Sequence, residues 1–389
     1  MKILVNALPL VGLQTGMARY VRCLYHQMEA LPDVAVSYFD GSRCHNHMPS
    51  EADPDRWSKR TEKLWSLPDP LIVGLNAVGW LCYESRLRKK CREEIYDIYH
   101  ETTFFPAAVE KVPVVYTLHD ISLLKYRHNH PRERIWFFDL FFKRRLRYAS
   151  HILTVSNYVR NEIIAELGVP DHAITCVYEA PAPIFAPKSM SEVAKTLEIH
   201  GWPKEYVLYV GTLEPRKNLS VLIRALSMTK TKIPLILVGW RGWGRSEWLQ
   251  EIRAHGLEER VFLAGYVDEA MLVSLYSGAS VFVYPSLYEG FGLPILEAMA
   301  CGCPVICSNV SSLPEVAGDA ALLIDPQRPE ELSHALDRVL TDSELREQMV
   351  VRGLKRARKF TWQETAARTL EVFARVVRDS PRSQSNPGM

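Results

Sequence analysis

No segment of this sequence is hydrophobic for long enough to cross a lipid bilayer. The longest apolar run, residues 71–83, contains Asn76 and two glycines and is shorter than the roughly 20 residues that a spanning helix needs. The apolar start of the chain is interrupted by Asn6 and Pro9, which is not the pattern of a secretory signal. We therefore expect neither a transmembrane helix nor export.

A disulfide framework and an excess of charge of one sign are also lacking. The 8 cysteines are scattered over 389 residues, so we expect reduced thiols and a cytoplasmic protein. Cys301, Cys303 and Cys307 lie close together, but they span a helix end, a turn and a strand without a further Cys or His pair, which favours packing over metal binding. The 47 basic and 45 acidic residues give a net charge of +2, which does not suggest nucleic acid as a partner.

The length of the chain exceeds what one ordinary hydrophobic core supports, and two α/β domains fit it better. Short β-branched or aromatic runs alternate with segments of helical periodicity, which is typical of parallel sheets flanked by helices. The alternation occurs in two series, which predicts a doubly wound pair. The predicted strands are residues 3–6, 34–39, 96–100, 112–118, 152–155 and 174–178 in the first series, and 207–210, 235–238, 261–264, 281–284, 305–307 and 322–324 in the second.

The boundary between the two series is expected at residues 180–203, where four prolines form the sharpest break in composition. Before it, Ser156 is expected to cap a helix that ends at Leu167 and is followed by Gly168. We place the domains at 1–185 and 200–360. A C-terminal helix at about 362–378 has an apolar stripe and is expected to pack back on the first domain, and 379–389 is expected to be a disordered tail.

The most informative segment is Glu289-Gly-Phe-Gly-Leu-Pro-Ile-Leu-Glu297, which follows the predicted strand 281–284. The glycines allow a tight turn and Pro294 suits the start of a helix, so Glu289 is predicted on the loop and Glu297 in the first helical turn. Unpaired N–H groups and the helix dipole make such a start an anion site that suits a diphosphate. Against this, an acidic residue near a helix start and a glycine turn are both common in structural roles.

A second segment, Gly211-Thr-Leu-Glu-Pro-Arg-Lys-Asn218, follows the first predicted strand of the second series. Arg216 offers paired donors to phosphate oxygens and Lys217 offers a compact charge, and together they can offset the negative charge that grows on a departing nucleotide diphosphate. Adjacent basic residues on a loop are more often simply solvated. It is their combination with the loop around Glu289 that favours a functional site.

These two segments resemble those of the retaining glycosyltransferases of family 4. The likeness is in Glu289 and Glu297 with seven residues between them, in Gly211 followed by Arg216-Lys217, and in Pro-Ser-Leu-Tyr-Glu-Gly-Phe-Gly-Leu-Pro around Glu289. Further similar segments are Thr15-Gly-Met-Ala-Arg-Tyr20, Thr117-Leu-His-Asp120, Thr154-Val-Ser156 and Phe360-Thr-Trp362. The resemblance covers nearly the whole chain and implies the GT-B fold, in which two Rossmann-like domains face each other across a cleft.

The resemblance also implies roles for individual residues. Arg216 and Lys217 would bind the diphosphate, Glu297 the ribose hydroxyls, and Glu289 and His119 the transferred sugar. The remaining donor-binding residues would be Gly16, Gly211, Tyr266, Val267, Phe291, Gly292 and Leu293. Outside that context, a histidine before an aspartate at a strand end stabilises a loop about as often. One departure is Tyr178-Glu-Ala-Pro181, where many members have an Asn-Gly turn.

By the same resemblance the enzyme is a retaining hexosyltransferase of surface polysaccharide synthesis, such as lipopolysaccharide, with a nucleotide sugar as co-substrate and no cofactor. No metal site is expected, since the residues singled out for the donor include no Asp-x-Asp pair of the kind that positions a divalent ion in the other main glycosyltransferase fold. GDP-mannose is the first choice of donor, and UDP-glucose, UDP-N-acetylglucosamine and deoxysugar donors stay open. A nucleotide-sugar epimerase of the same fold and a non-catalytic sensor are the alternatives.

The acceptor would be a glycan or a lipid-linked saccharide, on the first domain. Residues 135–147 join aromatic and basic side chains, and Arg86, Arg88, Lys89, Lys90 and Arg92 add further charge. Such a surface can meet anionic lipid headgroups, which would place the protein peripherally on the inner face of the cytoplasmic membrane. The competing interpretation is that the aromatic residues pack inward while the basic ones are solvated.

Overall fold

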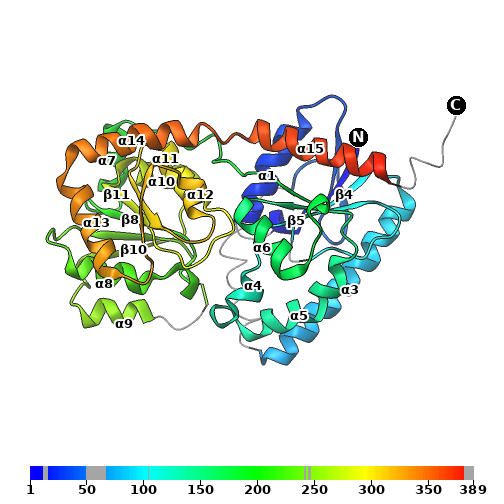
Figure 1. The fold of residues 1–389 in the computed structure, drawn as a ribbon, viewed down its shortest axis with the longest axis horizontal. Helices are drawn as coiled ribbons and strands as arrows, with labels where there is room; N and C mark the ends of the chain where they lie inside the picture. The colour runs from blue at the N-terminus through cyan, green and yellow to red at the C-terminus, as the bar shows by residue number, and fades with distance from the viewer. Residues whose placement is uncertain (12–15, 50–66, 104, 241, 244–246, 381–389) are drawn as a thin grey trace. The chain divides into compact units, whose positions relative to one another are not determined.

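The computed structural model describes residues 1–11, 16–49, 67–103, 105–240, 242–243 and 247–380. The chain divides into two compact units (Figure 1). The first unit consists of Met1–Glu179 together with Trp362–Met389, and the second unit is Ala180–Thr361. The chain therefore leaves the first unit after Glu179 and returns to it at Trp362.

The first unit contains a seven-stranded sheet in the order β3-β2-β1-β4-β5-β6-β7. All neighbouring strands are parallel except β2 and β3. The strands are β1 Lys2–Asn6, β2 Ala35–Phe39, β3 Cys44–His45, β4 Ile98–Glu101, β5 Val114–Leu118, β6 His151–Thr154 and β7 Ile174–Cys176. The α-helices are α1 Gly16–Glu29, α3 Asp69–Glu93, α4 Ser122–Lys125, α5 Arg132–Leu146, α6 Asn157–Leu167 and α15 Trp362–Asp379, with 3-10 turns η1 Leu8–Val11, η2 Arg127–Asn129 and η3 Asp171–Ala173.

Helices cover both faces of the sheet of the first unit, so its central strands are buried on either side. Every residue of β4, β5 and β6 is buried, as expected for parallel strands between helical layers. Helix α15 packs beside α1 (Figure 1), where Trp362 lies edge-on to Tyr20 with ring centroids 6.1 Å apart. The apolar stripe of this C-terminal helix is thus covered by the first unit.

The second unit contains a six-stranded, fully parallel sheet in the order β10-β9-β8-β11-β12-β13. Its strands are β8 Val207–Val210, β9 Leu235–Val238, β10 Val261–Gly265, β11 Val281–Tyr284, β12 Val305–Ser308 and β13 Ala321–Ile324. Its helices are α7 Met190–Ile199, α8 Leu219–Met228, α9 Glu247–Ala254, α10 Glu269–Gly278, α11 Leu293–Ala300, α12 Leu313–Ala317, α13 Pro329–Thr341 and α14 Ser343–Ala357, with the 3-10 turn η4 Pro215–Lys217. Both sheets have the strand order of doubly wound nucleotide-binding folds, which confirms the predicted fold class.

Local signals explain where several helices start and end. The Ser156 hydroxyl accepts a hydrogen bond from the Val159 amide at 3.2 Å and caps α6, and Gly168 ends that helix in the left-handed region at φ 64. Ser189 and Glu192 form a reciprocal capping box at the start of α7. Residues 180–203, which we expected to be a linker, therefore contain a helix that belongs to the second unit.

Short or edge elements were harder to predict. Strand β3 was missed, since two residues are too few to show alternation.

No helix within the described ranges is long and apolar enough to span a membrane. The tail after Ser380 lies outside the described residues.

Candidate active site

The strand order of the second unit reverses between β8 and β11, and the sequence-predicted loops leave the sheet at this point. Open α/β sheets bind ligands outside the carboxyl ends of their strands at such a reversal. The loop after β8 carries Arg216 and Lys217, and the loop after β11 carries Glu289. The Leu287 amide donates a hydrogen bond to the Arg216 carbonyl at 2.9 Å, which joins the two loops directly.

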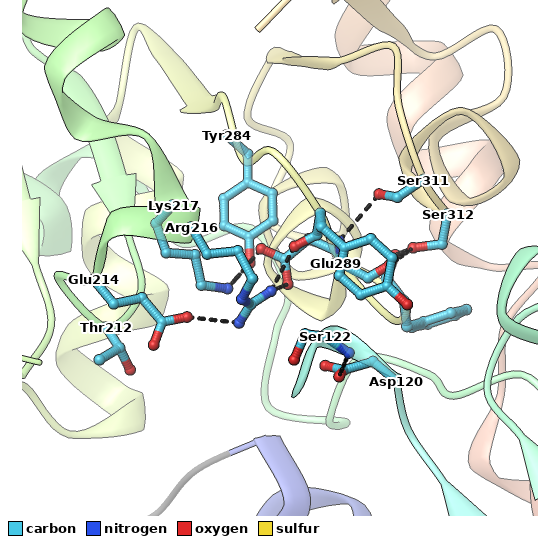
Figure 2. Close-up of polar contacts among 12 residues, drawn as sticks. Asp120, Ser122, Thr212, Glu214, Arg216, Lys217, Tyr284, Glu289, Ser311 and Ser312 are labelled. Carbon is cyan, nitrogen blue, oxygen red and sulfur yellow. Dashed lines mark hydrogen bonds and ion pairs between the residues drawn. The ribbon is translucent and has the colours of Figure 1, made fainter. Parts of the chain in front are cut away.

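Two cations from the first loop converge on one carboxylate of the second (Figure 2). Lys217 Nζ donates to Glu289 Oε1 at 2.6 Å and to the Tyr284 hydroxyl at 2.8 Å. Arg216 donates to Glu289 Oε2 at 3.1 Å, to Glu214 Oε1 at 2.7 Å and to the Tyr288 carbonyl. We call these four charged residues, Glu214, Arg216, Lys217 and Glu289, the ion cluster.

Burial makes the ion cluster electrostatically strong. The side chains of Arg216, Lys217 and Glu289 are 12%, 10% and 9% exposed. Burial opposes ionisation of Glu289, but Lys217 and Arg216 outweigh it and lower the pKa of this carboxyl to about 2. Burial lowers the pKa of Lys217, because it disfavours the charged form, and the negative charge of Glu289 opposes that shift. Glu289 is therefore an anion at neutral pH, and it holds both cations in place at the end of the sheet.

Three further side chains support the loop around Glu289, and the sequence analysis did not single them out. The Ser312 hydroxyl donates to the carbonyls of Glu289 at 2.9 Å and Phe291 at 2.8 Å, and the Ser311 hydroxyl accepts from the Glu289 amide at 3.1 Å (Figure 2). Tyr284, the last residue of β11, anchors Lys217. The feature of the sequence that could have indicated these three residues is their position, since each follows or ends a predicted strand.

Three glycines connect the loops after β8, β9 and β10. The Gly211 amide donates to the Val238 carbonyl at 2.9 Å, and the Gly239 amide donates to the Gly265 carbonyl at 2.8 Å. A Cβ on Gly239 would lie 1.9 Å from the Gly211 carbonyl oxygen, so only glycine fits there. Tyr266 and Val267 follow directly, and Tyr266 is 42% exposed. The two predicted base-side residues thus lie on the same edge of the sheet as Gly211.

The start of α11 is built from Phe291, Gly292 and Leu293. Gly292 precedes the helix at φ 113, and a Cβ there would lie 2.8 Å from Leu313 Cδ2, so the turn requires glycine. Glu297, which we predicted in the first helical turn, lies one residue beyond it, because α11 begins at Leu293. Glu297 is 1% exposed and accepts a hydrogen bond from the Tyr276 hydroxyl at 3.2 Å. Its carboxylate is thus fixed behind the helix start.

Two of the predicted site residues belong to the first unit. His119 follows β5, and its Nδ1 lies 3.2 Å from Glu179 Oε1. Gly16 is the first residue of α1, and nothing lies within 4 Å of the position that its Cβ would take. Thr15, the start of the similar segment, lies outside the described residues.

The part of the chain that the structure describes contains no group of three or more His, Cys, Asp or Glu side chains that could hold a metal ion. Cys301, Cys303 and Cys307 are all buried, as packing residues are. The sequence does contain one Asp-x-Asp, at Asp53 and Asp55, and it lies outside the described residues.

Two protein families match most of the chain between them. The family described as Glycosyltransferase Family 4 matches residues 15–180, and the family described as Glycosyl transferases group 1 matches residues 195–356. The O-antigen chain mannosyltransferase B of Escherichia coli is 34% identical over 384 residues, which are 96% of this chain and 99% of the relative. The serotype-specific mannosyltransferase WbdA of Escherichia coli is 29% identical over 240 residues, 60% of this chain but only 29% of the larger relative.

Solved structures of glycosyltransferases share the fold. Sucrose-phosphate synthase from Thermosynechococcus elongatus superposes with a TM-score of 0.74 at 22% identity, over 97% of this chain and 99% of its own. Anabaena HepE, solved with UDP-glucose, gives a TM-score of 0.72 at 20% identity over 96% of this chain and all of its own, 100%. These likenesses confirm the predicted GT-B fold.

Proposed function

This chain belongs to the glycosyltransferases of family 4 and is a hexosyltransferase, and from that premise we propose that it transfers mannose from GDP-mannose with retention of anomeric configuration. The acceptor is a glycan or a lipid-linked saccharide of a surface polysaccharide. The choice of mannose rests on the near full-length likeness to a mannosyltransferase. Family membership also favours transfer over the epimerisation that the sequence left open.

The observation that carries the proposal is the ion cluster at the strand reversal of the second unit. A departing nucleotide diphosphate gains negative charge as the bond to the sugar breaks, and preorganised cations stabilise that charge. Glu289 keeps Lys217 and Arg216 at the carboxyl ends of β8 and β11 before any ligand arrives. Two of the three N–H donors of Lys217 are used, by Glu289 and Tyr284, which leaves the third for a phosphate oxygen.

The remaining residues surround the diphosphate in this proposal. The amides of Phe291, Gly292 and Leu293 at the start of α11 and the backbone at Gly211 donate to phosphate oxygens, as helix starts and glycine turns do. Glu297 accepts from the ribose hydroxyls, while Tyr266 and Val267 border the base. In the first unit, Gly16 lets the backbone approach the phosphates and His119 contacts the sugar.

The chemical step needs no enzymic nucleophile. The bond between the anomeric carbon and the phosphate oxygen breaks, and the acceptor oxygen bonds to the same face of that carbon. The acceptor proton passes to the leaving phosphate, so atoms and charge balance. The protein contributes position and electrostatic stabilisation, and it excludes the water that would hydrolyse the donor.

The test has a binding arm and a turnover arm. A thermal-shift screen of nucleotides and nucleotide sugars should show GDP and GDP-mannose raising the melting temperature in a concentration-dependent way, because a ligand that binds only the folded state stabilises it. Lys217→Met should lower kcat by about a hundred- to thousandfold, equivalent to roughly 3–4 kcal/mol of barrier. The exposed Lys195→Met in the same unit is the matched control.

Each arm has an outcome against the proposal. Stabilisation by UDP-glucose and not by GDP-mannose would keep the glycosyltransferase and reject mannose. Near-normal turnover by both Lys217→Met and Arg216→Ala would reject the ion cluster as the site. Loss of activity in the presence of a chelator would contradict catalysis without a metal.

We further propose that the first unit contacts anionic membrane through α3 and α5, which pack side by side (Figure 1). Leu71, Leu75 and Val78 on the solvent face of α3 are 57%, 54% and 61% exposed. The same helix ends in a basic segment, where the side chain of Lys89 is 77% exposed. Apolar side chains followed by basic ones suit the boundary between acyl chains and acidic headgroups.

Some apolar residues of helix α5 pack inward, and others are exposed to solvent. Phe138, Phe141 and Phe142 are buried, whereas Trp136 and Leu140 are each 46% exposed, above the basic segment 143–147. Flotation with vesicles of phosphatidylglycerol should therefore recover the protein, and Leu75→Ser/Val78→Ser should weaken recovery several-fold. The control is Ile199→Ser, since Ile199 is an 80% exposed apolar residue of the second unit. Equal recovery of all three proteins, or recovery on neutral vesicles alone, would contradict the proposal.

A further inference from the structure

His119 is held in a defined orientation by two neighbours within the first unit. Its ring meets the ring of Tyr20 edge-on, with centroids 4.9 Å apart and an interplanar angle of 90°. Its Nδ1 lies 3.2 Å from Glu179 Oε1, a distance at which an N–H can donate to a carboxylate. The imidazole is thus fixed on one side by packing and on the other by an acidic group.

Glu179 is an unusual residue to find in this place. It is 4% exposed, and within the described residues His119 is the basic side chain that its carboxylate contacts, with Nδ1 3.2 Å from Oε1. A buried carboxylate without a strong donor is destabilising, so its burial here implies a use for the pair. Glu179 also lies in the four residues, Tyr178 to Pro181, where this sequence departs from the family pattern.

The other ring nitrogen of His119 is available. Its Nε2 is buried and has no hydrogen-bond partner among the residues that the structure describes. In a neutral imidazole only one nitrogen carries a proton, so a ring that turns a protonated Nδ1 toward Glu179 has a lone pair on Nε2. A lone pair in that position accepts a hydrogen bond, and a hydroxyl group is the matching donor.

We propose that Glu179 is a positioning residue that orients His119 and fixes its tautomer, so that Nε2 accepts a hydrogen bond from one hydroxyl of the transferred sugar. This inference rests on the proposed function, in which His119 contacts the sugar. It adds that the pair selects donors by a single hydroxyl. The same arrangement orients metal-binding and catalytic histidines, where the group behind the ring sets which nitrogen is presented.

The position of Glu179 is fixed where the chain crosses between the two units. It is the residue at which the chain leaves the first unit, and the Thr365 hydroxyl donates to the carbonyl of the preceding Tyr178 at 2.8 Å. The returning chain begins the first unit again at Trp362, which packs on Tyr20, the residue that also packs on His119. Outgoing and returning segments thus hold the carboxylate next to the imidazole.

The experiment measures discrimination between donors rather than activity alone. Wild-type protein, Glu179→Ala, Glu179→Gln and His119→Ala are assayed with GDP-mannose and with each of its monodeoxy analogues. For wild type, removal of the contacted hydroxyl should lower kcat/KM by about ten- to hundredfold, because it leaves Nε2 without a donor. Glu162→Gln, a buried carboxylate of α6 in the same unit that pairs with Lys125, is the control.

The expected result is loss of discrimination for that one analogue in Glu179→Ala and in His119→Ala. Glu179→Gln should restore part of it, since the amide oxygen still accepts from Nδ1. Equal loss of kcat/KM toward all donors in Glu179→Ala would show a merely structural role and overturn the inference. If wild type turns over no mannose donor, the proposed function fails instead, and the two failures are distinguishable.

Discussion

Two buried carboxylates lie at or beyond the ends of corresponding strands in the two units and have opposite electrostatic surroundings. Glu101 ends β4, which is the neighbour of β1 where the order of the first sheet reverses, and Glu289 follows β11, the neighbour of β8 in the second sheet. Glu289 meets two cations, whereas Glu101 accepts hydrogen bonds from neutral groups. The donors to Glu101 include the Asn6 amide and the Thr103 hydroxyl at 2.6 Å and the Tyr99 hydroxyl at 2.8 Å.

The difference teaches how one topology supports two tasks. Burial raises the pKa of Glu101, and its hydroxyl and amide neighbours only oppose that rise. At Glu289 the two cations reverse the effect of burial and lower the pKa. The first carboxyl stabilises a loop, while the second holds two cationic side chains in place at the end of a sheet. In the proposed function the diphosphate binds at the second arrangement, where the two cations can donate to its oxygens.

The largest expected effect is the removal of the carboxylate from the ion cluster. Glu289→Ala leaves the buried Lys217 without its carboxylate partner and Arg216 with Glu214 alone, so the free energy of unfolding should fall by about 3–5 kcal/mol. Urea denaturation measures this change. The exposed Glu205→Ala in the same unit should stay within about 0.5 kcal/mol of wild type. An unchanged midpoint for Glu289→Ala would mean that the cluster does not bear on stability.

The next effect compares glycines in the two units. Gly239→Ala places a Cβ 1.9 Å from the Gly211 carbonyl, so the loop after β8 must shift, and stability and donor binding should both decrease. Gly168→Ala in the first unit meets nothing within 4 Å, and only its left-handed φ is unfavourable, by about 1–2 kcal/mol. Thermal unfolding without GDP measures the stability of each variant, and the rise in melting temperature on adding GDP measures whether the variant still binds the nucleotide. Equal GDP binding by both variants would contradict the steric argument.

The pH dependence of stability should differ in sign between the two carboxyls. Glu289 has a folded-state pKa of about 2, below the ordinary glutamate pKa of 4.5, so it stabilises the fold above pH 4.5 and this contribution is lost as the pH falls toward 2. Glu101 has a raised pKa, so its contribution is present below pH 4.5 and is lost as the pH rises.

Two isosteric variants test this contrast. The deficit in unfolding free energy of Glu289→Gln relative to wild type should shrink as the pH falls from 4.5 to 2. Glu101→Gln should instead gain on wild type as the pH rises above 4.5. Urea denaturation at a series of pH values measures both, and parallel curves for the two variants would contradict the comparison.

The smallest effects are at helix caps, one in each unit. Ser156→Ala and Ser189→Ala each remove the side-chain cap of a helix and should lower the free energy of unfolding by about 1 kcal/mol, with no change in kcat. Urea denaturation and a turnover assay provide the two readings. A loss of turnover in either variant would indicate that the helix supports the site.

The sequence by itself determined the elements that repeat or begin with a local signal. Strands 207–210, 235–238 and 281–284 were predicted with the bounds that the structure shows, because a short buried β-branched run can be recognised without knowing which strands lie beside it. The cap at Ser156 and the glycine turn before α11 were legible for the same reason. The order of segments was enough to identify the family.

Only the tertiary structure decided which side chains meet. Arg216 and Glu289 are 73 positions apart in the chain, and their pairing depends on β8 and β11 being neighbours in the sheet. Likewise Glu179 was named in the sequence only as part of the departure at Tyr178–Pro181, and it lies against His119 because the segment after β7 comes close to the segment after β5. The periodicity of a short segment indicates which of its residues are buried. The pairing of distant loops depends instead on the order and register of the strands, which cannot be read from any short segment.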